Sequence, residues 1–104
     1  MNIYYHVTVK ENELEIFNKG LIPGKGKRSL LINEDRNAIY LFKNESAMED
    51  ALMNWLGEEL EEKELVILEI KLPETFPIEE NPNSYEAISY EIIDPKYIRV
   101  YKYE

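Results

Sequence analysis

The fold is decided by one apolar stretch in the second half of the chain, Leu65-Val66-Ile67-Leu68-Glu69-Ile70-Lys71-Leu72. Successive side chains of a β-strand point to opposite faces of the sheet, so every second residue from Val66 to Leu72 shares one apolar face. Leu65 and Ile67 make the opposite face apolar as well at the start of the stretch. This pattern predicts a central strand that is covered on both sides at its start.

The N-terminal segment predicts a strand followed by a helix. Residues 3–7 are rich in aromatic and β-branched side chains, which favour a strand. Thr8-Val9-Lys10-Glu11 then matches a capping box, in which Thr8 caps a helix and Glu11 reaches back to the cap. Gly20 is placed to end this helix as a residue of left-handed conformation.

A second strand and a second helix follow, and three strands complete the order. Residues 37–42 predict the second strand, and Ser46-Ala47-Met48-Glu49 is a second capping box that opens a helix to about Leu60. After the stretch already described, residues 84–93 and 97–103 predict two more strands. Because the late strands cluster instead of alternating with helices, residues 1–104 predict a single small α+β domain with a mixed or antiparallel sheet and two helices.

The composition excludes several classes of protein. The chain has 104 residues, which suits one domain, and it has no cysteine. Disulfide scaffolds, thiolate metal sites and cysteine nucleophiles are therefore excluded. The N-terminus lacks the pattern of a secretory signal, and the apolar runs are shorter than a membrane span. We therefore expect a cytoplasmic protein that does not enter a membrane.

The charge is strongly acidic, with one basic segment. The net charge of −9 argues against binding nucleic acid or an anionic membrane through the whole surface. Lys25, Lys27 and Arg28 lie together in a glycine-bearing loop. These side chains are candidates to meet a phosphate, although loop cations are usually only solvated charges.

Few side chains are candidates for chemistry. His6 is the only histidine, so a histidine-rich metal site is excluded, and no metal is expected. A lone histidine on an apolar strand is more often a hydrogen-bonded core residue than a ligand. Tyr40, between two apolar residues of the second predicted strand, is likewise more often a packing residue.

Two carboxylates of the predicted strand at residues 84–93 are alternatives for a catalytic acid. Strand alternation places Glu86 in one row with apolar and aromatic residues, and Glu91 on the opposite face. A carboxylate in an apolar row is costly unless it is paired or used. Glu86 is therefore the stronger candidate, with Glu91 as its alternative.

The order of these motifs resembles the ADP-ribosyltransferase fold. Tyr5-His6-Val7-Thr8, a helix and then Gly20-Leu21-Ile22-Pro23 resemble the opening of that fold, above all in its small DNA- and RNA-directed members and in RNA 2′-phosphotransferases. Ala38-Ile39-Tyr40-Leu41-Phe42 before a helix is similar to its tyrosine-bearing strand. Ser84-Tyr85-Glu86, followed by a proline turn and a closing strand, is similar to its acidic strand.

The resemblance implies that NAD is the substrate, with no metal. By this resemblance His6 hydrogen-bonds a ribose hydroxyl, and the backbone around Val7 and Thr8 recognises the nicotinamide amide. Tyr40 would stack on the nicotinamide ring. Glu86 would hold the nicotinamide-ribose 2′-hydroxyl and stabilise an oxocarbenium-like transition state, where a preorganised carboxylate is effective.

The resemblance also bears on which residue binds the pyrophosphate and on which reaction is catalysed. Arg28 in the basic loop would meet the NAD pyrophosphate by a bidentate contact. The position two residues before Glu86 is Ser84, where arginine-modifying members carry a second acid. The chain has only Arg28, Arg36 and Arg99, which disfavours the phosphotransferase activity, since that activity uses several arginines.

Two functions from different classes follow. The first is an NAD-dependent enzyme that transfers ADP-ribose to a macromolecular acceptor, protein or nucleic acid, or that cleaves NAD. The second is a non-catalytic, small acidic interaction or inhibitor protein of phage or mobile-element type, on a degenerate transferase fold. The enzyme is favoured because solubility explains an acidic composition, whereas Glu86 in an apolar row requires a reason.

Overall fold

The computed structural model describes residues 1–24, 38–54, 63–80 and 85–103, which form one antiparallel sheet with a helix on each face. The strands are β1 (Asn2–Val9), β2 (Ile39–Phe42), β3 (Leu65–Leu72), β4 (Glu79–Glu80), β5 (Glu86–Ser89) and β6 (Ile98–Tyr103). Their order is β4-β5-β2-β1-β3-β6, and all neighbouring strands are antiparallel. The α-helices among these residues are α1 (Glu13–Lys19) and α3 (Glu45–Asn54). The predicted α+β class with an antiparallel sheet is confirmed.

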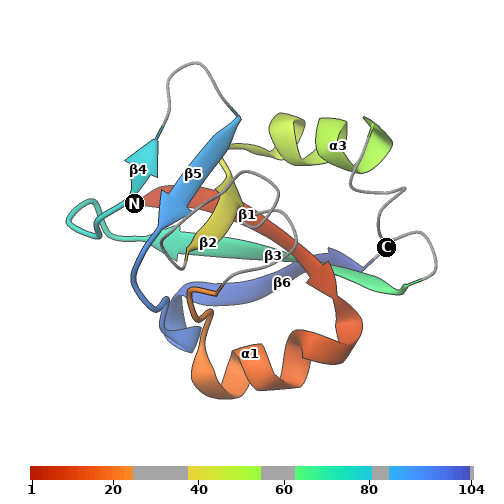
Figure 1. Cartoon of the computed structure of the whole chain (residues 1–104), viewed down its shortest axis with the longest axis horizontal. Helices are drawn as coiled ribbons and strands as arrows, with labels where there is room; N and C mark the ends of the chain where they lie inside the picture. The colour runs from red at the N-terminus through yellow and green to blue at the C-terminus, as the bar shows by residue number, and fades with distance from the viewer. Residues whose placement is uncertain (25–37, 55–62, 81–84, 104) are drawn as a thin grey trace.

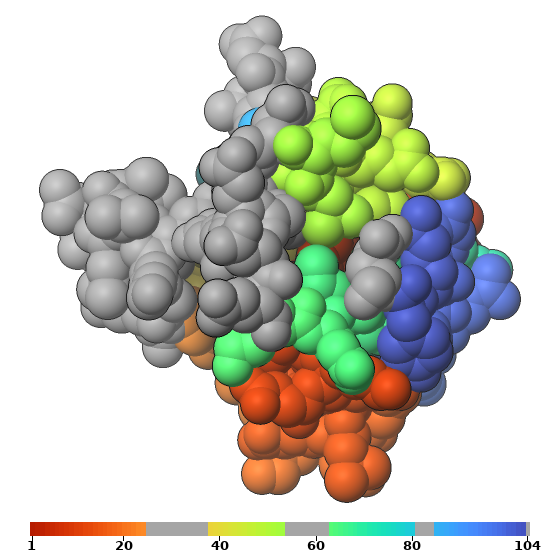
Figure 2. Space-filling view, turned by 90° about the vertical axis from the view of Figure 1, so that its right-hand side faces the viewer, coloured from red at the N-terminus to blue at the C-terminus, as the bar shows by residue number. Residues whose placement is uncertain are grey.

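The two helices lie on opposite faces of the sheet (Figure 1; Figure 2). Ile16 of α1 belongs to a buried cluster with Leu68 of β3. Met48 of α3 belongs to a separate cluster with Ile67, the neighbour of Leu68 in β3. Because Ile67 and Leu68 point to opposite faces, the sheet is a middle layer with core on both sides. We refer below to the α1 face and the α3 face of the sheet.

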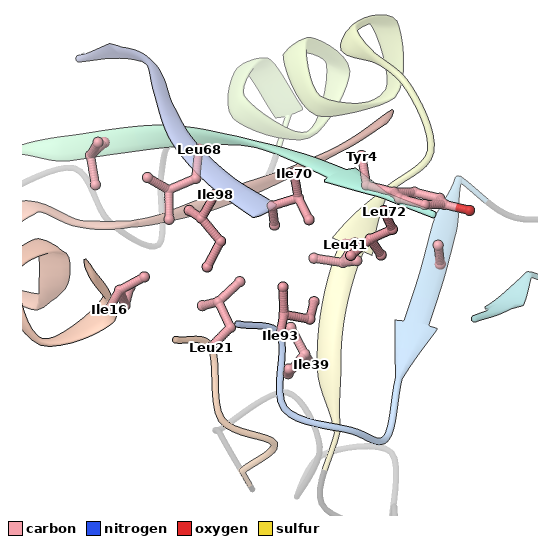
Figure 3. Packing of buried hydrophobic residues seen from close by; sticks show 12 residues of the cluster. Tyr4, Ile16, Leu21, Ile39, Leu41, Leu68, Ile70, Leu72, Ile93 and Ile98 are labelled. Atoms are coloured by element: carbon pink, nitrogen blue, oxygen red, sulfur yellow. The ribbon is translucent and has the colours of Figure 1, made fainter. Parts of the chain in front are cut away.

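The larger core lies on the α1 face (Figure 3). Its side chains come from five strands, from α1 and from the segments that follow α1 and β5. The buried members are Tyr4, Ile16, Leu21, Ile39, Leu41, Val66, Leu68, Ile70, Leu72, Ala87, Ile93 and Ile98. Residues 65–70 of β3 are all buried, which confirms that this strand is central and covered on both faces at its start.

One charged residue, Glu69, is buried within β3. Its side chain points to the α3 face, and the residue is 6% exposed. Arg99 of the neighbouring strand β6 donates to Glu69 Oε1 from Nε and from Nη2, each at 2.7 Å. A buried carboxylate needs such partners, because taking an unpaired charge out of water costs roughly several kcal/mol.

β1 is joined unevenly to its two neighbours. It pairs with β3 at every residue from Asn2↔Leu72 to Val9↔Leu65. Among the described residues it pairs with β2 at one position, Tyr5↔Phe42. In Figure 1, β2 and β5 accordingly cross the direction of β1, β3 and β6 at a steep angle. Within the described ranges, no strand pairs with the β2-side edge of the C-terminal half of β1, which we call its open edge.

The predicted capping box at Thr8 is wrong. Thr8 is still part of β1, where it pairs with Val66. A 3₁₀ turn, Lys10–Asn12, then precedes α1, and neither Val9 nor Asn12 caps through its side chain. Thr8 instead accepts a hydrogen bond at Oγ1 from Asn12 Nδ2, at 3.1 Å. Pairing with β3 outweighed the local capping signal, because each added residue of the strand gains partners in a covered sheet.

Gly20 ends α1 as predicted, with a different backbone geometry. Its φ of 86° is positive, but its ψ of −178° lies outside the left-handed helical region. A Cβ on this residue would lie 2.2 Å from the carbonyl oxygen of Ile93. Glycine is therefore required both by the dihedral angles and by the close approach of two backbones.

The second capping box is also displaced. Asn44 Oδ1 accepts a hydrogen bond from the Ala47 N–H at 2.8 Å, and α3 begins at Glu45, so the predicted cap Ser46 is already within the helix. Asparagine is as good an N-cap as serine, so Asn44 and Ser46 are competing caps, and the backbone geometry of the folded chain selects Asn44. The predicted end of this helix near Leu60 lies outside the described residues.

The predicted strand at residues 84–93 is shorter than expected. β5 covers Glu86–Ser89, and the chain then turns, because Ser89 Oγ donates to the Glu91 carbonyl and accepts from its N–H. Ile93 returns to pair with Leu21 as an isolated bridge. Glu91 is exposed and lies outside the strand. No α-helix among the described residues is long and apolar enough to cross a membrane.

Candidate functional site

His6 lies in the middle of β1, where the open edge on the β2 side begins. It is half-buried on the α1 face, where alternation places it between Tyr4 and Thr8. Its Nδ1 is 2.9 Å from the backbone carbonyl oxygen of Tyr40 in β2. A carbonyl oxygen only accepts hydrogen bonds, so Nδ1 carries the proton in the neutral ring. Nε2 of His6 is then a hydrogen-bond acceptor.

The ring of His6 is uncharged at neutral pH. Burial lowers its pKa below the ordinary value of 6.5, and the opposing effect of the hydrogen bond to Tyr40 is smaller. A neutral imidazole with Nδ1 protonated binds a hydroxyl or amide donor through Nε2. It does not attract a phosphate, as an imidazolium would.

The backbone of Val7 faces the open edge of β1. The Lys10 N–H donates to the Glu64 carbonyl at 2.8 Å, which makes Lys10 and Glu64 a hydrogen-bonded pair of the β1–β3 ladder. In an antiparallel ladder the direction of the backbone groups alternates, so those of Thr8 and His6 point to β3. The N–H and C=O of Val7 therefore point toward β2, beyond the one paired position of Tyr5. A donor and an acceptor lie next to the His6 side chain.

A pocket of about 240 Å³ lies beside His6. Its described lining comes from His6 and Thr8 of β1, from Asn12 and Glu15, from Ile16, and from residues 20–22. The wall after α1 is fixed to the rest of the molecule, because Leu21 and Ile93 exchange two backbone hydrogen bonds of 2.9 Å. We call this hollow the β1 pocket.

The structure does not bring the Tyr40 and Glu86 side chains to this pocket. Tyr40 pairs with Ile88, and Phe42 pairs with Glu86, so all four side chains share one face. Phe42 belongs to the cluster under α3, which identifies that face as the α3 face. Of the predicted site, His6 and Thr8 line the pocket, Val7 lies between them in β1 with its side chain on the α3 face, and Tyr40 contributes its carbonyl group rather than its ring.

Glu86 does not lie in the row of β5 that is packed into the larger core. The row that is buried against the core holds Ala87 and Ser89, and Ser89 is 0% exposed. Glu86 and Ile88 are half-buried in the opposite row. The small side chains of Ala87 and Ser89 fit the core on the α1 face, and the larger side chains of Glu86 and Ile88 point to the α3 face. The predicted contact of Arg28 lies outside the described residues.

Sequence reasoning missed part of the pocket wall. Asn12, Glu15 and Ile16 line it together, and their spacing of three and four residues places them on one side of a helix. That spacing was available as a signal once the helix was expected. Across the described ranges, no group of three or more histidine, aspartate or glutamate side chains is placed to hold a metal ion.

Relatives provide no further guide to this site. No family model, no curated protein and no solved structure matches the chain. A function therefore has to follow from the residues around His6.

Proposed function

We propose that the chain binds NAD at the β1 pocket and transfers its ADP-ribose to a macromolecular acceptor. The observation that carries the proposal is the neutral His6 acceptor beside the outward-facing N–H and C=O of Val7. These three groups lie on one rigid strand, which is held along its length by β3. Sites built on strands keep their geometry better than sites on loops.

The chemistry of NAD matches these groups. The nicotinamide carboxamide offers one acceptor and one donor, which are complementary to the N–H and C=O of Val7. A ribose hydroxyl offers a donor to Nε2 of His6. Strand-edge groups commonly recognise ligands in this two-point manner, because an extended backbone presents donor and acceptor side by side. Both contacts agree with the roles that the resemblance implies for His6 and Val7.

Transfer requires a carboxylate as well as a binding site. Positive charge develops on the ribose when the nicotinamide leaves, and a nearby carboxylate stabilises it. The resemblance assigns this role to Glu86, whose side chain is on the α3 face. Binding and transfer are therefore separate parts of the proposal and are tested separately.

Binding is tested by thermal unfolding with increasing NAD. A ligand at about 100 times its dissociation constant stabilises the native state by about 2.7 kcal/mol, and Tm then rises by roughly 10 °C in a domain of this size. We expect this rise for the unmodified chain and for Tyr40→Leu, each compared with its own ligand-free Tm. His6→Phe should require at least ten times more NAD for the same rise in Tm, because the Phe side chain has no hydrogen-bond acceptor. A folded chain whose Tm does not move at millimolar NAD contradicts the proposal.

Transfer is tested with labelled NAD and a cell lysate. We expect labelled product or released nicotinamide from the unmodified chain. If Glu86 acts from the α3 face on the nicotinamide end at the edge of β1, Glu86→Gln should give neither. Glu91→Gln serves as the matched control, because it removes the alternative carboxylate. If NAD binds but Glu86→Gln and Glu91→Gln leave the products unchanged, neither carboxylate supports transfer.

The acidic composition supports one alternative, a non-catalytic protein that binds a basic partner. The net charge is −9, and the edge strand β4 consists of the exposed residues Glu79 and Glu80. Opposite charge steers such partners together. A pull-down that recovers one basic protein, with no response to NAD and no effect of His6→Phe, would support this alternative.

A further inference from the structure

The charges around the β1 pocket restrict what part of a nucleotide it can hold. Glu15 is the one residue among its described lining that carries a formal charge at neutral pH, because His6 is neutral. Lys19 lies 3.6 Å from Glu15 and offsets part of this negative charge, but Lys19 does not line the pocket. The described lining thus presents a carboxylate and no cation.

The remaining polar groups suit uncharged partners. Asn12 Nδ2 donates one of its two hydrogens to Thr8 Oγ1, so the other Nδ2 hydrogen and the Thr8 hydroxyl hydrogen remain as donors, and Asn12 Oδ1 remains as an acceptor. Nε2 of His6 is a second acceptor. Two acceptors and two neutral donors match ribose hydroxyls and the amino or ring nitrogens of a base. A phosphate, which is an acceptor only, finds neutral donors and no cation in the described lining.

The size of the pocket agrees with one nucleoside unit. Its volume of about 240 Å³ is below the roughly 300–1,000 Å³ of pockets that enclose a drug-sized ligand. A dinucleotide therefore places only one end in it; because the nicotinamide is proposed to meet Val7 at the edge of β1, the end in the pocket is the adenosine, whose ribose carries the 2′-phosphate in NADP.

We infer that Glu15 is a specificity-determining residue, which makes the β1 pocket select NAD over NADP. The inference rests on the proposed binding of NAD and adds to it the exclusion of a 2′-phosphate. Two effects exclude that group. Glu15 repels its negative charge, and phosphorylation replaces a ribose hydroxyl, which removes a donor that Nε2 of His6 could accept.

Glu11 provides a matched control for Glu15. The side chains of Glu15 and Glu11 are 68% and 70% exposed, and each has one lysine partner, at 3.6 Å and 4.0 Å. Glu11 lines a different hollow, next to Lys63 and Glu64. Glu15→Gln and Glu11→Gln therefore change the net charge equally, but only the first changes the charge of the β1 pocket.

The test is the ratio of the dissociation constants of NADP and NAD, measured by titration calorimetry on the full chain. We expect the unmodified chain to prefer NAD about tenfold, since a carboxylate near the protein surface repels a phosphate placed in the same pocket. Glu15→Gln should reduce the ratio at least threefold, and Glu15→Lys should invert it. Lys19→Gln should raise the ratio, because it removes the cation that offsets Glu15. Glu11→Gln should leave it unchanged.

The salt dependence of this ratio provides a second test, and two results would contradict the proposals. Raising sodium chloride from 50 to 300 mM should lower the ratio in the unmodified chain and have less effect in Glu15→Gln, because screening acts on the repulsion. If NAD binds but the ratio is the same in the unmodified chain, Glu15→Gln and Glu11→Gln, the inference is overturned and the proposed function stands. If a folded chain binds neither dinucleotide, the proposed function itself is overturned.

Discussion

At the scale of single residues, the hydrogen bond from His6 Nδ1 to the Tyr40 carbonyl determines the state of the candidate site. It fixes the tautomer, it directs Nε2 away from β2, and it joins β1 to β2 beyond their one paired position. Burial keeps the ring neutral by lowering its pKa. A single contact thus makes His6 both a part of the fold and a ligand-binding acceptor.

The lowered pKa of His6 predicts how stability depends on pH. The unfolded chain takes up a proton near the ordinary pKa of 6.5, whereas the folded chain resists it until a lower pH. Stability should therefore be constant above about pH 7.5 and fall as the pH decreases through 6.5, by at most about 1.4 kcal/mol per pH unit. Urea unfolding at a series of pH values measures this.

The control for this prediction is His6→Gln, which retains a donor for the Tyr40 carbonyl and cannot titrate. The difference in stability between the two chains should change between about pH 7.5 and 5.5, and the change should favour the variant at the acidic end. Carboxylates titrate mainly below this range and are common to both chains. A difference that is constant with pH would contradict a lowered pKa at His6.

The sequence predicted one part of this site and not another, for a physical reason. His6 and Val7 follow from a short local pattern, and a strand presents neighbouring groups in a known way. Tyr40 and Glu86 come from distant strands, and their faces depend on which rows are buried. At β5 the small residues Ala87 and Ser89 are buried, which no alternation pattern reveals because both rows are plausible cores.

At the scale of elements, the boundaries show where local and tertiary effects compete. Helix α3 has two possible caps within three residues, and the structure uses Asn44. The first helix has a capping signal at Thr8, and pairing with β3 overrides it. Strands and helices were correctly predicted where a long period supported them, as in β3. The starts of α1 and α3 and the end of β5 were not correctly predicted, because they depend on partners that the local pattern does not reveal.

The cap of α3 gives a prediction with an internal control. Asn44→Ala removes the acceptor of the Ala47 N–H and should lower the free energy of unfolding by about 1 kcal/mol. Ser46→Ala changes an exposed side chain at the position that the sequence favoured as the cap, and it should change stability by less than about 0.5 kcal/mol. Chemical denaturation of both variants compares them directly. An equal or larger loss for Ser46→Ala would place the cap at Ser46.

At the scale of the whole molecule, the net charge acts against the compact state. The radius of gyration is 12.9 Å, and the net charge is −9. The screening length is about 30 Å at 0.01 M salt and about 10 Å at 0.1 M, so like charges repel across the whole molecule only at low salt. The exposed ion pairs, such as Glu15 with Lys19, are weak and are screened as well.

Adding salt should therefore stabilise the protein. We expect Tm to rise by roughly 4 °C or more between 0.01 and 0.2 M sodium chloride, which corresponds to about 1 kcal/mol in a domain of this size. The double variant Glu79→Gln, Glu80→Gln removes two exposed negative charges of β4 and should show a smaller rise. A Tm that falls with salt would mean that ion pairs, not repulsion, dominate the surface charge.

The pairing of β1 with β3 also has a consequence for how the chain acquires its structure during synthesis. Asn2 has Leu72 as its partner, so β1 is synthesised well before the strand that pairs with it along its length, and only the single pairing with β2 is available earlier. Until then Tyr4, Tyr5 and Val7 remain exposed to other chains. Closing such a long loop early is slow, because its entropy cost precedes the gain from contacts. The N-terminal strand is thus the segment for which a chaperone that recognises extended apolar peptides would have the longest time to act.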